Sequence, residues 1–481
     1  MQTTIAISEE KLSPLSNPDS LHIHLAQYGL KMTTDELYVQ WAIGNRRHPR
    51  NWDVSRKVYD ISLIFFLEFF TYLLGQAFGG ILFPPYSEVF GRKRLYIVST
   101  ALYSVSCLVV AAVPSLWGVV VGRFVSGFLS AIPTIVVIGS IEDMFNARDR
   151  VWMVCIWAVT SNLGLIVGPI LSIYIVADLD WHWLYYIAAI ITGLLTFVLL
   201  TIRESRPSLL LAREVAQLRK VSKVESLEGA NPDHTPDLHS FVRLALSRPV
   251  LLFFTEPIVF IVSLISAISI ALVYLFTEAL PPIYQAFGFS PRQASLPFIA
   301  IGVGLSLGLL TRYIDLYIID QHRHQGRVLL PEHKLLGLWL GAPILAGGLW
   351  VFAWTIPPGV KDLHWSVSVI ALLLVGYSLT ELDYVLGGYL TDSYLSYASS
   401  GFSALSFLRS ILSAVFPLVS PHLFSALGAN LAVTVLAAMA TIFCIVPPLF
   451  TRYGERLRAR SAFAKQSLTM YRQYSVDENG Y

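Results

Sequence analysis

The chain has 481 residues, of which 55% are hydrophobic and only 14% are charged. Soluble domains carry roughly 25% charged residues, so the core of a soluble fold could not absorb this many apolar side chains. The net charge of +2 gives no electrostatic reason for binding nucleic acid. The composition therefore predicts an all-α integral membrane protein whose main partner is the lipid bilayer.

Residues 1–56 form a polar segment of cytoplasmic type, without the apolar run of a cleavable signal peptide. The segment becomes basic near its end, in "GNRRHPRNWDVSRK" at 44–57. Three cysteines, Cys107, Cys155 and Cys444, all fall within apolar stretches further along the chain. They predict small core side chains, with neither a disulfide framework nor a metal site, and no cofactor is expected.

Apolar stretches long enough to cross a bilayer, about 20 residues each, recur along the rest of the chain. A charged break at 203–249 divides them into two groups. The predicted organisation is an N-terminal membrane half at 57–202, a cytoplasmic linker at 203–249, a C-terminal membrane half at 250–451 and a cytoplasmic tail at 452–481. The eleven predicted spans lie near 58–86, 95–113, 117–140, 151–175, 182–202, 250–276, 295–319, 335–355, 365–390, 402–425 and 430–450.

From residue 91 onward, loops rich in Lys and Arg alternate with loops that carry almost no Lys or Arg, called bare loops here. "GRKR" at 91–94 and "NARDR" at 146–150 are basic, whereas "ADLDWH" at 177–182 and "GFSPRQ" at 288–293 carry few positive charges. Lys and Arg accumulate in the cytoplasmic loops of membrane proteins. The alternation therefore predicts a multi-pass protein whose basic loops face the cytoplasm.

The stretch "FPPYSEVFGRKRLYIV" at 83–98 breaks two apolar segments with prolines, an acid and three consecutive basic residues. One interpretation is a topological anchor, in which Arg92, Lys93 and Arg94 hold the turn on the cytoplasmic side. The other is a charge latch, in which Glu88 pairs with a basic group or a helix N-terminus in one conformation and releases it in another.

Ionisable residues inside predicted spans are candidates for function, because each costs several kcal/mol unless it is paired. Arg123 is predicted either to hold helices together by an ion pair or to take part in proton-linked conformational change. Glu68, in "FFLEFF", could carry a proton or could belong to an abnormal first span. Glu381 and Asp383 lie so close together that both would rarely ionise when buried, and they are predicted either to line the substrate cavity or to mark a wet local distortion.

Two further charges are predicted to be structural. Glu256 precedes Pro257, which breaks the helical hydrogen bonding near the end of a span. Arg409 is predicted to be a helix-packing cation that lies near Asp392.

Several motifs resemble those of the major facilitator superfamily, in particular the fungal branch of its twelve-span drug:proton antiporters. "PPYSEVFGRKR" resembles the charged loop between the second and third spans, including Glu88, Gly91 and the basic triplet. "GRFVSGF" at 122–128 resembles the basic motif of the fourth span, with Arg123 as its buried arginine. "NLGLIVGPILS" at 162–172 resembles the antiporter motif of the fifth span, with Gly164, Gly168 and Pro169 in place.

The resemblance implies two helical halves that rock about a central cavity and export small amphipathic organic compounds, such as drugs or secondary metabolites, in exchange for protons. The chain is also predicted to be a monomer without enzymatic activity, located in the plasma membrane. The sequence departs from the pattern where paired glycines should close the antiporter motif, because Ser172 and Ile173 stand there. A transport-inactive or sensor-like member of the fold, and a facilitator or importer, therefore stay open as alternatives.

The first span is anomalous, because "GNRRHPRNWDVSRK" and "GRKR" are both basic and should lie on the same side of the membrane. That requires two crossings, yet only about 33 residues lie between the two basic stretches, whereas two crossings and a turn need roughly 40 or more. The chain is therefore predicted to lack roughly 35–40 residues of spans 1 and 2 relative to its family. Eleven spans would result, the first a fused and overlong helix.

Overall fold

The computed structural model of the chain describes residues 30–32, 39–41, 72–113, 115–145, 147–206, 209–210, 238–325, 330–357, 359, 363–394 and 397–474. The chain divides into two compact units, residues 1–65 and 66–481. In the first unit, the described residues form an antiparallel ribbon of β1 (Leu30–Met32) and β2 (Val39–Trp41), in which Leu30 pairs with Trp41. The second unit is built from helices.

A first helix group, α3–α8, covers residues 74–199. The group consists of α3 (Leu74–Phe90), α4 (Lys93–Ala112), α5 (Leu116–Ala131), the π-helical stretch η4 (Ile132–Val136), α6 (Val137–Met144), α7 (Ala147–Asp178) and α8 (His182–Leu199). Pro133 lies in η4, where its missing N–H and its ring prevent regular α-helical hydrogen bonding. The predicted fourth span is consequently a helix with an internal irregularity.

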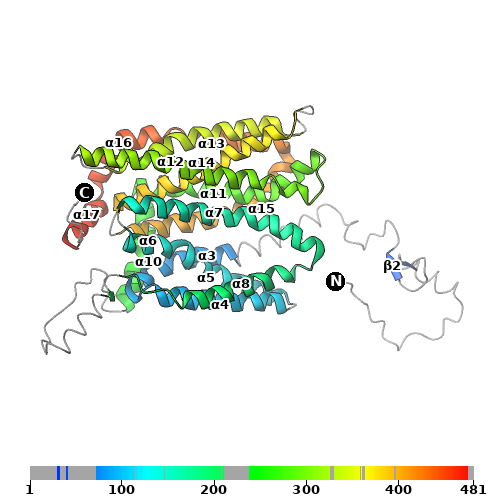
Figure 1. Cartoon of the computed structure of the whole chain (residues 1–481), viewed down its shortest axis with the longest axis horizontal. Helices are drawn as coiled ribbons and strands as arrows, with labels where there is room; N and C mark the ends of the chain where they lie inside the picture. Colours follow the sequence, from blue (N-terminus) through cyan, green and yellow to red (C-terminus); the bar gives the residue numbers. More distant parts are fainter. Residues whose placement is uncertain are drawn as a thin grey trace. The chain divides into compact units, whose positions relative to one another are not determined.

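A second helix group, α10–α17, covers residues 238–474. The group consists of α10 (Leu238–Thr255), α11 (Pro257–Ala286), η5 (Gln293–Ser295), α12 (Phe298–His324), η6 (Pro331–Lys334), α13 (Leu336–Thr355), α14 (Ser366–Tyr394), α15 (Ala398–Phe443), α16 (Val446–Arg460) and α17 (Ala462–Tyr474). The long helices of both groups lie alongside one another (Figure 1).

Two helix breaks in the second group change the predicted span boundaries. The predicted span 250–276 is interrupted at Glu256, whose backbone is extended, and α11 then runs to Ala286, past two internal prolines. Pro257 explains the break, since proline disfavours helical geometry in the residue before it and is well tolerated as a first helical residue. Within α15, Gly428 has φ +76° and separates two helices, as the predicted loop between 402–425 and 430–450 requires.

Among the described residues, nine helical segments are long and apolar enough to cross a membrane. One of them, Ser400–Arg460, contains the break at Gly428 and so holds two spans, and Leu74–Pro84 adds a shorter apolar helix. From residue 93 onward the described residues therefore hold ten crossing segments, in agreement with the ten spans predicted from 95 onward, whereas Leu74–Pro84 is too short to cross by itself and lies within the predicted first span. The predicted fused first helix at 58–86 lies outside the described residues up to residue 71.

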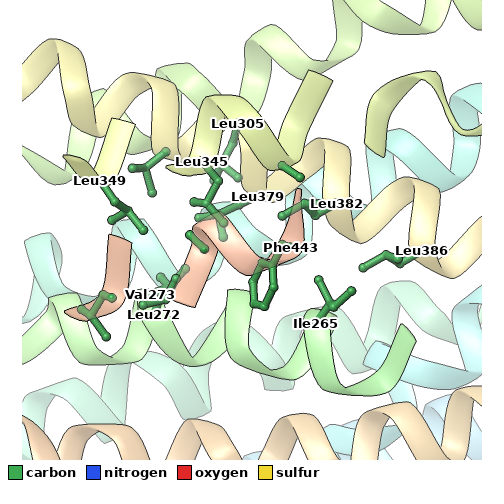
Figure 2. Close-up of a cluster of buried hydrophobic side chains, with 14 of the residues drawn as sticks. Ile265, Leu272, Val273, Leu305, Leu345, Leu349, Leu379, Leu382, Leu386 and Phe443 are labelled. Carbon is green, nitrogen blue, oxygen red and sulfur yellow. The ribbon is translucent and has the colours of Figure 1, made fainter. Parts of the chain in front are cut away.

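The apolar core is formed mainly by helices α11–α15 (Figure 2). Leu272 of α11, Leu305 of α12, Leu345 of α13 and Leu379 of α14 are all at most 2% exposed. Phe443, near the end of α15, packs with them and is also labelled in Figure 2. These five helices therefore surround a continuous apolar interior.

The two helix groups meet mainly along α7 with α12 and α3 with α15, with smaller contacts of α7 with α14 and of α3 with α10. Trp152 of α7 packs edge-on against Tyr313 of α12, with ring centroids 5.0 Å apart. Gly302 of α12 faces Leu163 and Ile166 of α7, and a methyl group at Gly302 would still meet both at ordinary contact distance.

The helices have two ends. The end near residues 91–94 is the basic end, and the end near residues 177–182 and 288–293 is the bare end.

Candidate functional site

The turn between α3 and α4 is held by Glu204, a carboxylate that did not stand out from the sequence. Glu204 accepts hydrogen bonds from the backbone N–H groups of Arg92 at 2.9 Å and Lys93 at 3.1 Å, at the N-terminus of α4. Gly91 has φ +90°, and a Cβ there would lie 2.8 Å from a carboxylate oxygen of Glu204. Glycine is therefore required at 91 both by the backbone conformation and by the approach of this carboxylate.

The environment of Glu204 keeps its carboxyl ionised. Burial raises the pKa of Glu204, but the backbone N–H donors of Arg92, Arg206, Lys93 and Ser205 outweigh burial and leave this pKa below its usual value. The donors of Ser205 and Arg206 lie 3.1 Å and 3.2 Å from the carboxylate. An anion at the positive end of α4 is also favoured by the helix dipole.

The basic residues of the same turn make separate contacts. The Arg92 side chain is buried and donates to the Val136 carbonyl at 3.4 Å, in the π-helical stretch η4. Lys93 donates from Nζ to the Leu200 carbonyl at 3.2 Å, just beyond α8, and Arg94 is exposed. The turn thus contacts two other segments of the first group, η4 and the end of α8.

The proposed latch residue Glu88 lies in the last turns of α3, but its side chain is outside the part that the structure describes, so its pairing stays a prediction. Glu68 lies outside the described residues altogether. Glu204 could have been noticed as an acid directly after the predicted span 182–202, in a loop on the same side as the basic turn.

Arg123 lies between aromatic rings in the first helix group. It donates to the Tyr185 hydroxyl of α8 at 2.9 Å. Its guanidinium carbon is 5.3 Å from the ring centre of Tyr72 and 5.7 Å from that of Tyr185. These contacts stabilise a cation in an apolar environment through ring quadrupoles. The role of Arg123 in coupling stays a prediction.

Glu381, near the middle of α14, forms an ion pair with Arg312 of α12. Arg312 also forms an ion pair with Asp315, at 2.8 Å, one helical turn further along α12. The side chains of Arg312 and Glu381 are 0% exposed, and that of Asp315 is 6% exposed. The ring of Tyr384 lies over the guanidinium, with its centre 3.8 Å from the guanidinium carbon.

Asp383 forms an ion pair with Arg409 of α15, which also donates to the Ser266 hydroxyl of α11. Glu381 and Asp383 are two residues apart and so point to different sides of α14. Each consequently meets its own arginine, and the two acids do not share one site.

The prediction that Arg409 lies near Asp392 is wrong, because Asp392 pairs with Lys334 at 2.6 Å. The reason is the register of two antiparallel helices. Asp383 and Arg409 are each thirteen residues from position 396, within the turn between α14 and α15, and antiparallel helices bring such positions to the same level.

Two acids at the basic end connect the C-terminal helices α16 and α17 to the rest of the second group. Glu256 accepts from the Tyr394 hydroxyl at 3.0 Å and from the Ser461 hydroxyl at 2.7 Å, which agrees with the structural role expected for it. Glu332 pairs with Arg458 of α16 at 2.5 Å and accepts from the Tyr389 hydroxyl at 3.2 Å.

The residues of the antiporter-like motif lie on α7. Gly164 and Gly168 face open space, since a Cβ at either would meet nothing within 4 Å, and Pro169 lies inside the helix without ending it. Further along α7, Ser172 contributes to a groove of about 790 Å³ that Arg292 also lines, between α7 and the segment before α12.

At the bare end, Arg292 forms an ion pair with Asp178 at 2.6 Å, and this pair joins the two helix groups. The two side chains are 49% and 67% exposed, so the pair is accessible to water. Such exposed pairs contribute little to stability, about 0–1 kcal/mol. The Asp178–Arg292 contact can therefore break at small cost.

The relatives of this chain are membrane transporters. The multidrug transporter TPO1_2 of Candida glabrata is 29% identical over 407 residues, which cover 84% of this chain and 70% of the relative. The MFS-type transporter penM of Penicillium rubens is 31% identical over 400 residues, covering 82% of this chain and 77% of the relative.

Solved structures of similar fold include the human organic anion transporter MFSD10, with a TM-score of 0.58, 16% identity and coverage of 81% of this chain and 85% of that one. The proton:xylose symporter XylE bound to a sugar analogue gives a TM-score of 0.56 at 17% identity, with coverage of 84% and 88%. At these identities the likeness shows the fold alone.

The sequence matches the family model described as Major Facilitator Superfamily over residues 52–417, well over half of the chain. Together with the apolar helices, this match makes the chain an integral, multi-pass membrane protein. The chain belongs to the major facilitator superfamily, and it groups with fungal multidrug transporters and efflux pumps.

Proposed function

We propose that the chain exports small amphipathic organic compounds, such as drugs or secondary metabolites, in exchange for protons. The observation that carries this proposal is the likeness to fungal proteins named multidrug transporters and efflux pumps, which extends over more than four fifths of the chain. The protein acts as a transporter rather than as an enzyme. It functions as a monomer in the plasma membrane.

The transport cycle uses the boundary between the two helix groups. Membrane transporters of two repeats move substrates by rocking one repeat against the other around a site near the middle of the bilayer. The α7–α12 and α3–α15 contacts form this boundary, and the exposed Asp178–Arg292 pair crosses it at the bare end. Breaking and remaking that pair accompanies opening and closing on the bare side.

The division of the chain follows the same scheme. Residues 57–202 and 250–451 form the two moving halves, residues 203–249 form the cytoplasmic linker, and 1–56 and 452–481 form cytoplasmic ends. The contact of Glu204 with the α3–α4 turn supports a linker whose first residues are fixed to the N-terminal half.

Reconstitution into proteoliposomes tests the proposal. A fluorescent amphipathic amine serves as substrate, and a pH-sensitive dye inside the vesicles records proton movement. We expect an imposed pH gradient to drive dye-reported exchange of protons for the amine, and an ionophore that collapses the gradient to stop it. Amine movement that is independent of the gradient would indicate a facilitator, and the absence of amine movement in either condition would contradict the proposal.

A transport-inactive form is a second candidate, and the packing of the first helix group favours it. The apolar window of α8 is only 6% buried and that of α4 is 28% buried, whereas that of α11 is 72% buried. A first group that lacks roughly 35–40 residues of spans 1 and 2 would leave these helices without their usual neighbours.

Sequencing of the transcript across the Tyr72 codon separates the two candidates. A message with extra codons at this point would show that the active protein has twelve spans. If the message matches this chain, a tag at Met1 should be found outside the cell, because one crossing places the two basic flanks on opposite sides. A cytoplasmic tag together with intact transport would show that two crossings fit into this segment.

A further inference from the structure

The buried cluster of Arg312, Asp315 and Glu381 contains one cation and two acids. The three side chains are at most 6% exposed and come from neighbouring positions of α12 and α14. An isolated buried charge in a membrane span costs several kcal/mol, and a pair removes much of that cost only when the charges balance. With both carboxyls ionised, this cluster would have an excess negative charge in the apolar interior.

Most groups around the cluster are neutral. Cys155 of α7, Tyr377 and Tyr384 of α14 and the Thr311 hydroxyl lie close to it. Lys334 of η6 is a further cation within electrostatic range of Asp315, but it forms its ion pair with Asp392, at 2.6 Å. Its positive charge is therefore shared with a third acid, and a proton on one carboxyl would complete the charge balance of the cluster.

Hydrogen bonding within the cluster is incomplete. Both carboxylate oxygens of Asp315, the Oε1 atom of Glu381 and the Nε and Nη1 atoms of Arg312 are buried without a hydrogen-bond partner, although Nη1 lies 2.8 Å from Asp315 Oδ2. A protonated carboxyl has an O–H donor and could donate to a neighbouring acceptor. A single proton would thus satisfy both the charge balance and part of the unused hydrogen-bonding capacity.

The cluster also lies where a change in charge can affect the rocking motion. α12, which carries Arg312 and Asp315, packs against α7 of the first helix group, and Cys155 of α7 lies within electrostatic range of all three charged residues. Gly337 of α13 packs directly against the Glu381 carboxylate, and a Cβ at position 337 would collide with it. The carboxylate is therefore closely enclosed by helices of the second group and borders the first.

We propose that Arg312, Asp315 and Glu381 form the proton-binding site of the transport cycle, in which one proton is shared between the two carboxyls. When the proton leaves a carboxyl oxygen for water, the second carboxylate competes for Arg312, and the contact of α12 with α14 changes beside α7. This inference rests on the proposed proton-coupled transport, but proton binding at the cluster can be measured without any transport.

Infrared difference spectroscopy of the purified full chain measures the proton directly, through the carbonyl band of a protonated carboxyl at neutral pH. We expect a component of this band to be lost in Glu381→Gln and also in Asp315→Asn, since the remaining carboxylate then balances Arg312 one to one. Glu332→Gln is the matched control, because Glu332 is 8% exposed and has its own partner, Arg458. The control should retain the component.

The proteoliposome assay gives a second measurement on the same variants. Glu381→Gln and Asp315→Asn should lose proton movement coupled to the amine while retaining amine exchange across vesicles without a gradient. An infrared component unchanged in both variants would overturn the inference even if wild-type transport is proton-coupled. Loss of the component in a chain that moves no amine would support the proton site and contradict the proposed function instead.

Discussion

The two helix groups handle polar groups in the membrane differently. In the first group, the α3–α4 turn is stabilised at the basic end, where Glu204 accepts backbone N–H groups and Arg92 donates to a backbone carbonyl. In the second group, Glu381 and Asp383 pair with arginine side chains near the middle of the helices. Deep ion pairs require surrounding helices that exclude lipid from every side.

The difference in packing explains why the deep pairs lie in the second group. The apolar windows of α11 and α14 are 72% and 67% buried, compared with 28% for α4 and 6% for α8. The second group therefore provides an enclosed interior, and the first group does so to a smaller extent. If spans 1 and 2 lack the predicted length, the first group should be weakened while the second stays largely intact.

Arg312→Ala should have the largest effect, because it leaves two buried carboxyls without their cation. Breaking a buried pair by removing one partner costs about 3–5 kcal/mol, and here two acids lose the same partner. We expect little monodisperse protein after detergent extraction, measured by size-exclusion chromatography. The matched variant Arg458→Ala should be milder, since its side chain is 18% exposed and water can reach the acid left behind. Equal yields of Arg312→Ala and Arg458→Ala would show that burial of the arginine does not determine the cost of removing it.

The helices of both groups could be predicted from the sequence, because each bilayer crossing requires a long apolar run and the basic loops alternate in position. The partners in the deep pairs could not be predicted in the same way. Arg312 and Glu381 come from α12 and α14, which are separated by α13, so no loop fixes their relative level. Asp383 and Arg409 were within reach of prediction, because α14 and α15 follow each other directly and run antiparallel.

Arg123→Ala tests whether the partly buried Arg123 of the first group serves transport or packing. We expect proton-coupled transport to be abolished, while folding is affected less than by removing a core aromatic such as Phe276. The reason is that Arg123 donates to the Tyr185 hydroxyl, lies near the rings of Tyr185 and Tyr72, and is only partly buried. Transport and extraction yield are measured together for Arg123→Ala and Phe276→Ala.

The variant Arg123→Lys sharpens this test, because lysine keeps the charge and loses the planar contact with the rings. Normal transport by both Arg123→Lys and Arg123→Ala would show that Arg123 is a packing cation.

Glu88→Gln and Arg92→Ala should each slow transport while leaving expression and membrane insertion largely unchanged. The expected cause is a shift in the balance between inward-facing and outward-facing states, which changes rates without unfolding either state. Initial transport rates in vesicles are compared at equal amounts of inserted protein. If both variants transport at the wild-type rate, the turn is only a topological anchor, and the first group contributes no charge switch.

Glu204→Gln should have the smallest effect, a loss of about 1 kcal/mol in the free energy of unfolding at neutral pH, typical of removing a helix cap.

The stabilisation by Glu204 depends on pH with a definite sign. The pKa of Glu204 is lower in the folded protein than its usual value of 4.5, so its stabilisation is complete above that value and is lost as the pH falls through the lower folded pKa. In thermal unfolding in detergent, the melting temperature of wild type should therefore exceed that of Glu204→Gln at pH 7. This difference in melting temperature should become smaller as the pH falls below about 4.5. Comparing the two chains at each pH cancels the titration of the other acids, which both contain. A difference in melting temperature that stays constant with pH would mean that Glu204 holds the α3–α4 turn by its shape and by hydrogen bonds that need no charge. In that case a charged side chain would contribute to stability in the first group, as in the second, only where it pairs with a side chain of opposite charge.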